Sequence, residues 1–393
     1  MTVDLPRASL STMWAVQPRF EGDRIADFPA AAAEAGFAGI EINHSMDLRQ
    51  ARTLLEAARA FGVETRTLHA PAPSSLVEGA PPGLSGRENR TLNLASLDET
   101  ERRLAVAHHI ASIEFAARAR MQAVVVHLGG IYQLDVTIPA EDWLRARYLE
   151  WYATFEGTRS ETSPRSQLSV RPGAPLSAVE GPVEGPGDPR SPRPTPSDAS
   201  PLDGPPLTEA WIEHIELARR QRAEAAPPWL EAARRSLAEL APRAAEAGLT
   251  LGLESRLRYN EFPLPDEAAY LLADYPPEVA GYWHDVGHVE VLARIGVVPL
   301  EAWRTLLATR LVGAHIHDVH ALTDHRAPGL QASGRHEPGR VAPHRARGGG
   351  VNFEALARAL PPTAFRTFEV DQRESADLLV SGLALARTAG VVG

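Results

Sequence analysis

The feature that most constrains the fold is a regular alternation of short apolar runs with helical patterns. The apolar runs are nearly continuous, which is typical of parallel strands that are buried on both faces. Eight strand-plus-helix units of this kind predict an α/β fold, a single (β/α)8 TIM barrel that closes on itself. The candidate strands are residues 12–16, 38–43, 65–70, 123–129, 249–255, 279–285, 311–318 and 366–371, and the clearest helical patterns are residues 27–37, 47–62, 98–120 and 227–248.

One stretch, residues 157–206, interrupts the alternation. It is dominated by Pro, Gly, Ser and charged residues and contains too few large apolar side chains to form a core. We expect a disordered insertion after the fourth strand, between a first half of the barrel at residues 1–156 and a second half at residues 207–393. The favoured interpretation is a tolerated surface insertion, and the alternative is a lid or a partner-binding arm.

The composition excludes several classes of chemistry. The chain has no cysteine, so it has no disulfides, thiolate metal sites or cysteine nucleophiles. All 40 residues counted as Lys and Arg are arginine, which excludes Schiff-base chemistry and a lysine general base. The formal net charge of −10 disfavours a nucleic-acid partner. We also expect a cytoplasmic protein without a membrane partner, because no apolar run reaches the length of a membrane span.

Residues of the types that bind metals follow six consecutive candidate strands. Because the carboxyl ends of barrel strands converge on one mouth, residues that are distant in sequence are expected to meet there. Imidazole and carboxylate ligands without thiolate suit Zn, Mn, Co, Fe or Mg, and no organic cofactor is expected. The strand-end residues are His69, His127, Glu254, Asp285 with His288, His315 with His317 and Asp318, and Glu369.

A set of short motifs resembles the xylose isomerase-like TIM-barrel superfamily, which contains sugar and sugar-phosphate isomerases and epimerases as well as apurinic endonucleases. The motifs are "TLHAP", "VVVHLGG", "LGLES", "HDVGH", "GAHIHDV" with "TDHRAPG", and "FEV". The resemblance implies a central metal held by Glu254, Asp285, His315 and Glu369. In the epimerase branch the two glutamates also transfer protons, through a metal-stabilised enediolate. Salt bridges from Glu254 to Arg256 or Arg258, and from Glu369 to Arg373, are the structural alternatives.

The endonuclease branch implies more metal ligands. There, the histidines equivalent to His69 and His127 join the first glutamate at an additional zinc. A further cluster combines the counterpart of His288 with an Asp-x-His motif, for which this chain offers adjacent Asp324 and His325. We favour His325 for that position, with His344 as the alternative.

Other residues are candidates for contact with the substrate. His288 is expected to bind either the substrate or a second metal, and Arg256, His317 and Trp283 are expected to contact the substrate. Tyr259 and Phe262 are candidates for stacking on a sugar ring.

The leading hypothesis is a divalent-metal-dependent isomerase or epimerase of a small sugar or sugar phosphate. A lysine near the substrate is typical of true xylose isomerases, so they match less well. The alternatives are a multi-zinc phosphodiesterase that resembles the apurinic endonucleases, and a barrel that binds a ligand without catalysis. The sequence leaves open the substrate, the metal and the oligomeric state, including a homo-oligomer.

Overall fold

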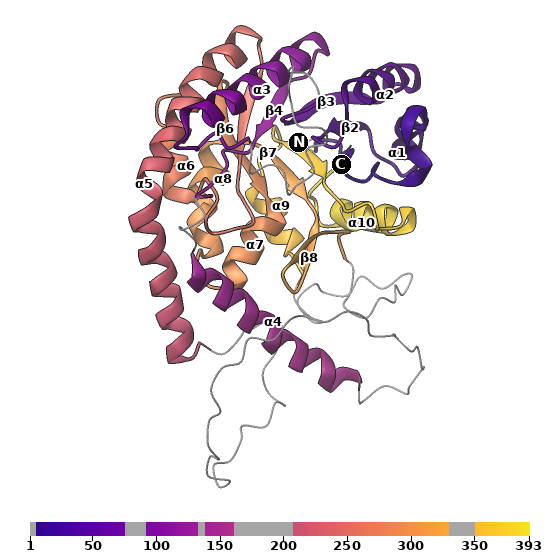
Figure 1. The fold of residues 1–393 in the computed structure, drawn as a ribbon. Coiled ribbons are helices and arrows are strands. Elements are labelled where there is room, and N and C mark those ends of the chain that lie inside the picture. Colours follow the sequence, from indigo (N-terminus) through magenta and orange to yellow (C-terminus); the bar gives the residue numbers. More distant parts are fainter. Residues whose placement is uncertain (1–4, 75–91, 133–137, 161–206, 330–349) are drawn as a thin grey trace.

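Eight parallel strands close into a barrel in the computed structural model of the protein (Figure 1). The structure describes residues 5–74, 92–132, 138–160, 207–329 and 350–393. Around the barrel the strands follow the order β1, β10, β7, β6, β5, β4, β3, β2, so the first and last strands are neighbours. The (β/α)8 fold predicted from the sequence is confirmed. The strands are β1 (Ser9–Ser11), β2 (Gly39–Ile42), β3 (Glu64–Ala70), β4 (Ala123–Val126), β5 (Thr250–Glu254), β6 (Ala280–Asp285), β7 (Leu311–Ile316) and β10 (Phe365–Phe368).

Helices follow the strands and form the outer layer (Figure 1). Local sequence sets several of their ends: Asp47 and Gln50 form a capping box at the start of α2, and Gly62 ends that helix with a φ of 67°. No helix in the described ranges is both long and apolar enough to cross a membrane. The helices are α1 (Phe28–Glu34), α2 (Leu48–Phe61), α3 (Glu99–Arg118), α4 (Pro139–Ser160), α5 (Glu209–Glu246), α6 (Pro265–Leu272), α7 (Val286–Arg294), α8 (Arg304–Thr309), α9 (Phe353–Ala359) and α10 (Ala376–Thr388).

Two local predictions were wrong. The first strand is β1 at Ser9–Ser11, and residues 12–15 of the predicted strand form turns instead, where Trp14 and Ala15 are buried. Helix α5 begins at Glu209 and runs through the proline pair at which the sequence pattern placed its start. Its buried stripe, which includes Trp211 and Trp229, packs against neighbouring helices and compensates for the backbone hydrogen bonds that the prolines remove.

The predicted insertion at residues 157–206 lies largely outside the described residues. Helix α4 continues to Ser160 and so includes the first residues of that range, while 161–206 are not described. Helices α4 and α5, on either side of it, pack together through the stacked rings of Trp143 and His214, whose centroids are 3.7 Å apart.

Trp283 fills the interior of the barrel beneath its carboxyl end. Its side chain is fully buried and packs on the ring of His315, with the centroids 5.2 Å apart. Two glycines on the neighbouring strands make room for the indole: a Cβ on Gly252 would lie 2.9 Å from it and a Cβ on Gly313 only 2.3 Å. Above this floor the barrel interior becomes polar.

A small antiparallel hairpin follows the seventh barrel strand. It consists of β8 (Asp318–His320) and β9 (Thr323–Arg326), and it was not anticipated from the sequence. The Asp318 carboxylate accepts backbone N–H bonds from Gly329 (3.0 Å) and Val351 (2.9 Å), on either side of residues 330–349. Asp318 therefore connects Gly329 to Val351, and the hairpin brings Asp324 and His325 to the barrel mouth.

Candidate active site at the barrel mouth

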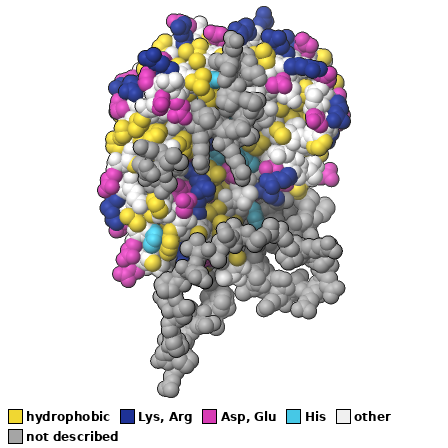
Figure 2. All heavy atoms as spheres, viewed as in Figure 1, with side chains coloured by type: hydrophobic (Ala, Val, Ile, Leu, Met, Phe, Trp, Pro, Cys, Tyr) yellow, Lys and Arg dark blue, Asp and Glu magenta, His cyan; other side chains and the backbone are white. Residues whose placement is uncertain are grey.

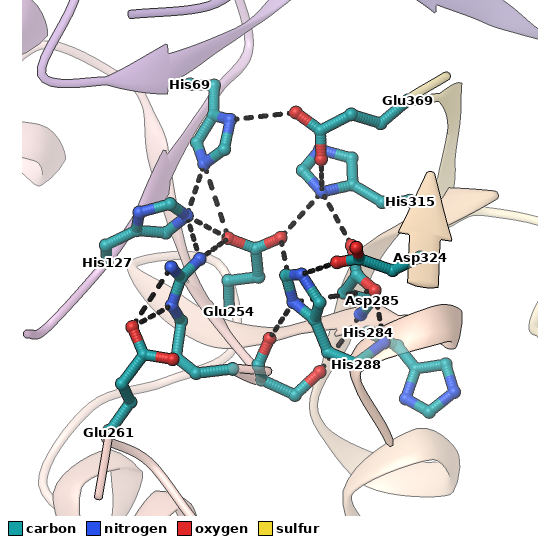
Figure 3. A network of polar contacts seen from close by, with 12 residues as sticks. His69, His127, Glu254, Glu261, His284, Asp285, His288, His315, Asp324 and Glu369 are labelled. Carbon is teal, nitrogen blue, oxygen red and sulfur yellow. Dashed lines mark hydrogen bonds and ion pairs between the residues drawn. The ribbon is translucent and has the colours of Figure 1, made fainter. Parts of the chain in front are cut away.

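Four side chains from the ends of β5, β6, β7 and the residue after β10 meet in the centre of the mouth (Figure 3). Nδ1 of His315 lies 2.7 Å from Oε1 of Glu254, 3.0 Å from Oε2 of Glu369 and 3.6 Å from Oδ2 of Asp285. Asp285 and His315 are register partners on adjacent strands, so the barrel itself aligns them. All four are buried. The structure thus brings together the four residues that the sequence suggested for a central metal.

His69 and His127 form a second group of ligand atoms with Glu254. Their Nε2 atoms are 2.6 Å apart, and both contact Oε2 of Glu254, at 3.3 Å for His69 and more closely for His127. Nδ1 of His69 also lies 3.3 Å from Oε1 of Glu369. Glu254 therefore connects this group to the central one, as Figure 3 shows.

A third group lies at the hairpin. Nε2 of His288 is 3.2 Å from Oδ2 of Asp324, and Nδ1 of His325 is 3.1 Å from the same oxygen. His325 has a φ of 55°, in the left-handed region, and its backbone is fixed on both sides: its N–H donates to Nδ1 of His317, and its carbonyl accepts from Asp371. The alternative residue for this position, His344, lies outside the described residues.

The buried carboxylates of the mouth raise the pKa values of several of its histidines, whereas burial and Arg256 hold the pKa of His127 well below its usual value. Burial alone would lower the pKa of His315, but Glu369, Glu41 and Glu254 raise it well above its usual value. Burial opposes the same shift at His69, where Glu254 and Glu369 raise the pKa to about 9. Burial would raise the pKa of Glu369, yet His315 and His69 hold it well below its usual value. Glu41, Glu254, Asp285 and Glu369 are all buried here. Because a buried negative charge is costly without a partner, these carboxylates require positive charge close to them.

Glu41 on β2 is a site residue that the sequence analysis missed. It is fully buried, and its Oε1 lies 3.0 Å from Nε2 of His315, on the side of the ring opposite Glu254. Its Oε2 accepts hydrogen bonds from the hydroxyls of Thr67 (2.8 Å) and Thr367 (3.3 Å). The available signal was an acid at an inward position of an otherwise apolar strand, "GIEI".

His317 lies behind Asp285 and is fully buried. Its Nδ1 accepts the backbone N–H of His325 at 2.9 Å, so its proton is on Nε2, which donates to both carboxylate oxygens of Asp285 at 2.9 and 3.0 Å. Asp285 also caps α7 by accepting the N–H of His288 at 2.7 Å. This arrangement favours a positioning role for His317.

Two residues near the predicted ligand Asp285 point elsewhere. Trp283 lies in the barrel floor, so its position favours packing rather than the expected substrate contact. His284 points out of the barrel, where its Nδ1 lies 2.7 Å from the hydroxyl of Tyr282. Of the acid and the two histidines in "HDVGH", only Asp285 and His288 reach the mouth.

Arg256 lies beside His127 at the edge of the site. Its guanidinium contacts Oε2 of Glu254 at 3.1 Å and Oε1 of Glu261 at 3.2 Å. The salt bridge from Glu254 to Arg256 therefore exists alongside the contacts with the possible metal ligands. By contrast, Arg373 pairs with Asp371 at 2.8 Å. Figure 2 shows histidine, acidic and arginine side chains together near the centre of this face.

Arg222 on α5 holds the loop that carries Arg256. It is buried, donates to the carbonyl of Glu261 at 2.9 Å and also bonds the carbonyl of Tyr259. The rings of Tyr259 and Phe262 lie 5.3 and 4.9 Å from its guanidinium carbon. Both aromatic residues are buried against Arg222, where the sequence analysis had suggested stacking on a sugar.

The comparisons with known proteins agree with the fold. Residues 29–151 match the family model described as "Xylose isomerase-like TIM barrel". Among solved structures, 3-keto-D-glucoside 4-epimerase from E. coli aligns with a TM-score of 0.53 and 15% identity, covering 98% of this chain and 99% of that one. No curated protein gives a significant match.

Two further solved structures are similar over nearly the whole chain. An L-ribulose 3-epimerase aligns with a TM-score of 0.53 and 13% identity. The alignment covers 98% of this chain and 95% of the epimerase chain. D-psicose 3-epimerase from Clostridium cellulolyticum H10, solved with D-tagatose, aligns with a TM-score of 0.51 and 12% identity. This alignment covers 98% of this chain and 99% of the epimerase chain. At these identities the likeness shows the fold, and the resemblance to xylose isomerase-like TIM barrels stated from the motifs is confirmed.

Proposed function

We propose that the protein is a divalent-metal-dependent isomerase or epimerase of a small sugar or sugar phosphate. The observation that carries this proposal is the position of Glu254 and Glu369, two buried carboxylates from β5 and the end of β10 that both contact Nδ1 of His315. A pair of carboxylates that reach one point from different strands suits the removal and return of a proton. The similarity of the fold to three sugar epimerases supports the proposal.

The residues present fit a divalent cation. Glu254, Asp285, His315 and Glu369 offer oxygen and nitrogen atoms within 4.8 Å of one another. Oε1 of Glu369 is buried, and its contact among the described residues is the ion pair with Nδ1 of His69 at 3.3 Å, so it retains a lone pair that a cation could accept. When bound, the metal would polarise the carbonyl and neighbouring hydroxyl of the substrate and so acidify the adjacent C–H.

The chain's own groups supply the remaining steps. Glu254 and Glu369 take the proton from carbon and return it, each acting as base in one direction and acid in the other. Asp285 is held by His317 and by the helix N–H of His288, and His315 is held by Glu41. The burial of this centre excludes bulk water while the proton is transferred.

Two measurements test the proposal. Elemental analysis of the purified, unchelated protein should give about one equivalent of Mn, Co, Fe or Mg per chain. The same protein, incubated with ketoses and their phosphates in D2O, should exchange a substrate C–H for deuterium. A chain that binds one such metal and catalyses no exchange with any compound in the set contradicts the proposal.

The second candidate is a multi-zinc phosphodiesterase. The observation that favours it is the pair of additional ligand groups, His69 with His127 and Glu254, and His288 with Asp324 and His325. Two or three equivalents of zinc, together with hydrolysis of a phosphodiester, would support this candidate over the epimerase. Its nucleic-acid substrates would also show salt-sensitive binding.

A further inference from the structure

The ligand group formed by His69, His127 and Glu254 has the composition of a zinc site. Two imidazoles and one carboxylate are a ligand set found at catalytic zinc ions. Each side chain offers one atom, and the three atoms lie within 4.8 Å of one another. Figure 3 shows the three side chains pointing toward one another. By ligand type alone, this group would take a second metal beside the central one.

Arg256 places a guanidinium among these ligand atoms. Its Nη1 lies 3.1 Å from Oε2 of Glu254 and also bonds Nε2 of His127. An arginine nitrogen only donates, so Nε2 of His127 accepts through its lone pair, which is the lone pair that a metal would need. Oε2 of Glu254 is likewise the oxygen that both histidines face. Arg256 therefore engages two of the three ligand atoms of the group.

Contacts on the far side of the guanidinium hold it in place. Nη2 of Arg256 lies 3.2 Å from Oε1 of Glu261, and Nε lies 3.4 Å from the same oxygen. Glu261 in turn accepts hydrogen bonds from the hydroxyl of Tyr132 (3.0 Å) and the backbone N–H of Arg258 (2.9 Å). The Arg256 side chain is only 14% exposed. It is therefore a buried cation that Glu254 and Glu261 compensate from opposite sides.

A metal ion in the same group would meet two costs. It would have to replace Arg256 at the lone pair of His127, and it would bring a double positive charge next to a guanidinium that cannot lose its proton. Like charges a few ångströms apart repel strongly where water is excluded. At the hairpin, by contrast, the partners of Asp324 are His288 and His325, whose rings can release a proton when a metal binds.

We propose that the guanidinium of Arg256 is the resident cation of the His69–His127–Glu254 group, and that this group takes no metal in the wild-type chain. Arg256 is then a positioning residue, because it holds Oε2 of Glu254 while Oε1 faces His315 in the central group. The inference does not depend on the proposed reaction, since it concerns only which cation these ligands hold. It removes one of the two additional ligand groups that favour the multi-zinc candidate.

Counting zinc ions on the full chain tests the assignment. The chelator-stripped protein is titrated with Zn²⁺, and the number of ions retained per chain is measured by calorimetry and by elemental analysis after desalting. Arg256→Met replaces the guanidinium by an uncharged side chain and should retain one equivalent more than the wild type. The matched control is Arg258→Met, at an arginine that is 48% exposed and contacts Asp142 at 3.3 Å; it should retain the wild-type number.

Variants at His127 locate the additional ion. His127→Phe combined with Arg256→Met should remove the extra equivalent, whereas His127→Phe alone should leave the wild-type number unchanged. A fall by one equivalent in His127→Phe alone overturns the inference, because it shows that His127 already binds a metal beside Arg256. The wild-type number of zinc ions in folded Arg256→Met overturns it equally.

A second pair of variants covers the case in which Arg256→Met does not fold. Loss of the guanidinium leaves the buried carboxylate of Glu261 without its partner, which is strongly destabilising. Arg256→Met combined with Glu261→Gln removes both charges of that ion pair, and circular dichroism establishes that the protein is folded. This double variant should retain one zinc ion more than Glu261→Gln alone, and equal numbers in the two proteins contradict the proposal.

Discussion

Nε2 of His315 lies 3.0 Å from Oε1 of Glu41, while Nδ1 of the same ring faces Glu254 and Glu369. A bond from Nε2–H to a carboxylate fixes the ring orientation and leaves Nδ1 directed at the central carboxylates. Carboxylates bonded to the far nitrogen of a metal-binding histidine also raise its basicity. Glu41 therefore connects β2, which contributes no ligand to the central set of four, to the centre of the site.

Replacing Glu41 should weaken metal binding without changing the ligands. We expect Glu41→Gln to lower the affinity for Mn²⁺ roughly tenfold, and Glu41→Ala to lower it up to about a hundredfold. Titration of the chelator-stripped protein with Mn²⁺ measures both. Thr67→Val is the control, because it removes only the hydroxyl that supports the other oxygen of Glu41. Equal metal affinities for wild type and Glu41→Ala would show that Glu41 has no positioning role.

Glu369→Gln should retain the fold. Its rate of exchange of the substrate C–H with deuterium should fall by a factor of about a hundred or more, because the proton-transferring carboxylate is removed. The measurement is exchange at saturating metal, so that weaker metal binding does not cause the loss. Asp371→Asn is a matched control, because Asp371 lies two positions away and its carboxylate bonds Arg373. Exchange at the wild-type rate in Glu369→Gln contradicts the assigned proton transfer.

A variant at His317 distinguishes positioning from substrate contact. Because His317 donates to both oxygens of Asp285, His317→Gln should reduce metal affinity roughly tenfold and leave the KM for the sugar unchanged at saturating metal. The KM and the metal dissociation constant are measured on the same preparation. A raised KM with unchanged metal affinity would instead support the substrate contact suggested by the sequence.

The convergence at the mouth could be predicted because barrel topology fixes where strands end. His69, Glu254 and Asp285 are far apart in sequence, yet each lies at the carboxyl end of a parallel strand. The carboxyl ends of all eight strands lie on the same face of the barrel. Identifying the strands was therefore almost enough to assemble the central site.

The residues that were missed depend on packing that a single strand or helix does not reveal. Glu41 differs from an ordinary strand acid only in facing inward. The first strand was misplaced because Trp14 and Ala15 are more apolar than "SLS", although they bury themselves in a turn after it. The β8–β9 hairpin has too few apolar residues to show strand periodicity.

The floor of the site offers a test of stability. A Cβ on Gly313 would lie 2.3 Å from Cζ3 of Trp283, so Gly313→Ala should destabilise the fold by about 1–3 kcal/mol through overpacking. Trp283→Phe removes the atoms in the way, so the double variant should lose less stability than the sum of the two single variants. Urea unfolding of all four proteins measures this coupling, and strict additivity contradicts the packing described.

The pH dependence of stability should carry a contribution from His109. Burial holds its pKa at about 4 in the folded protein, against an ordinary value of 6.5. Between these values the unfolded chain binds a proton that the folded protein does not, so this stability is present above pH 6.5 and is lost as the pH falls towards 4. Between pH 7.5 and 5.0, wild type should therefore lose about 2 kcal/mol more stability than His109→Gln. Urea unfolding at the two pH values measures the difference, and equal losses in both proteins would mean that the His109 ring is protonated as readily in the folded protein as in the unfolded chain.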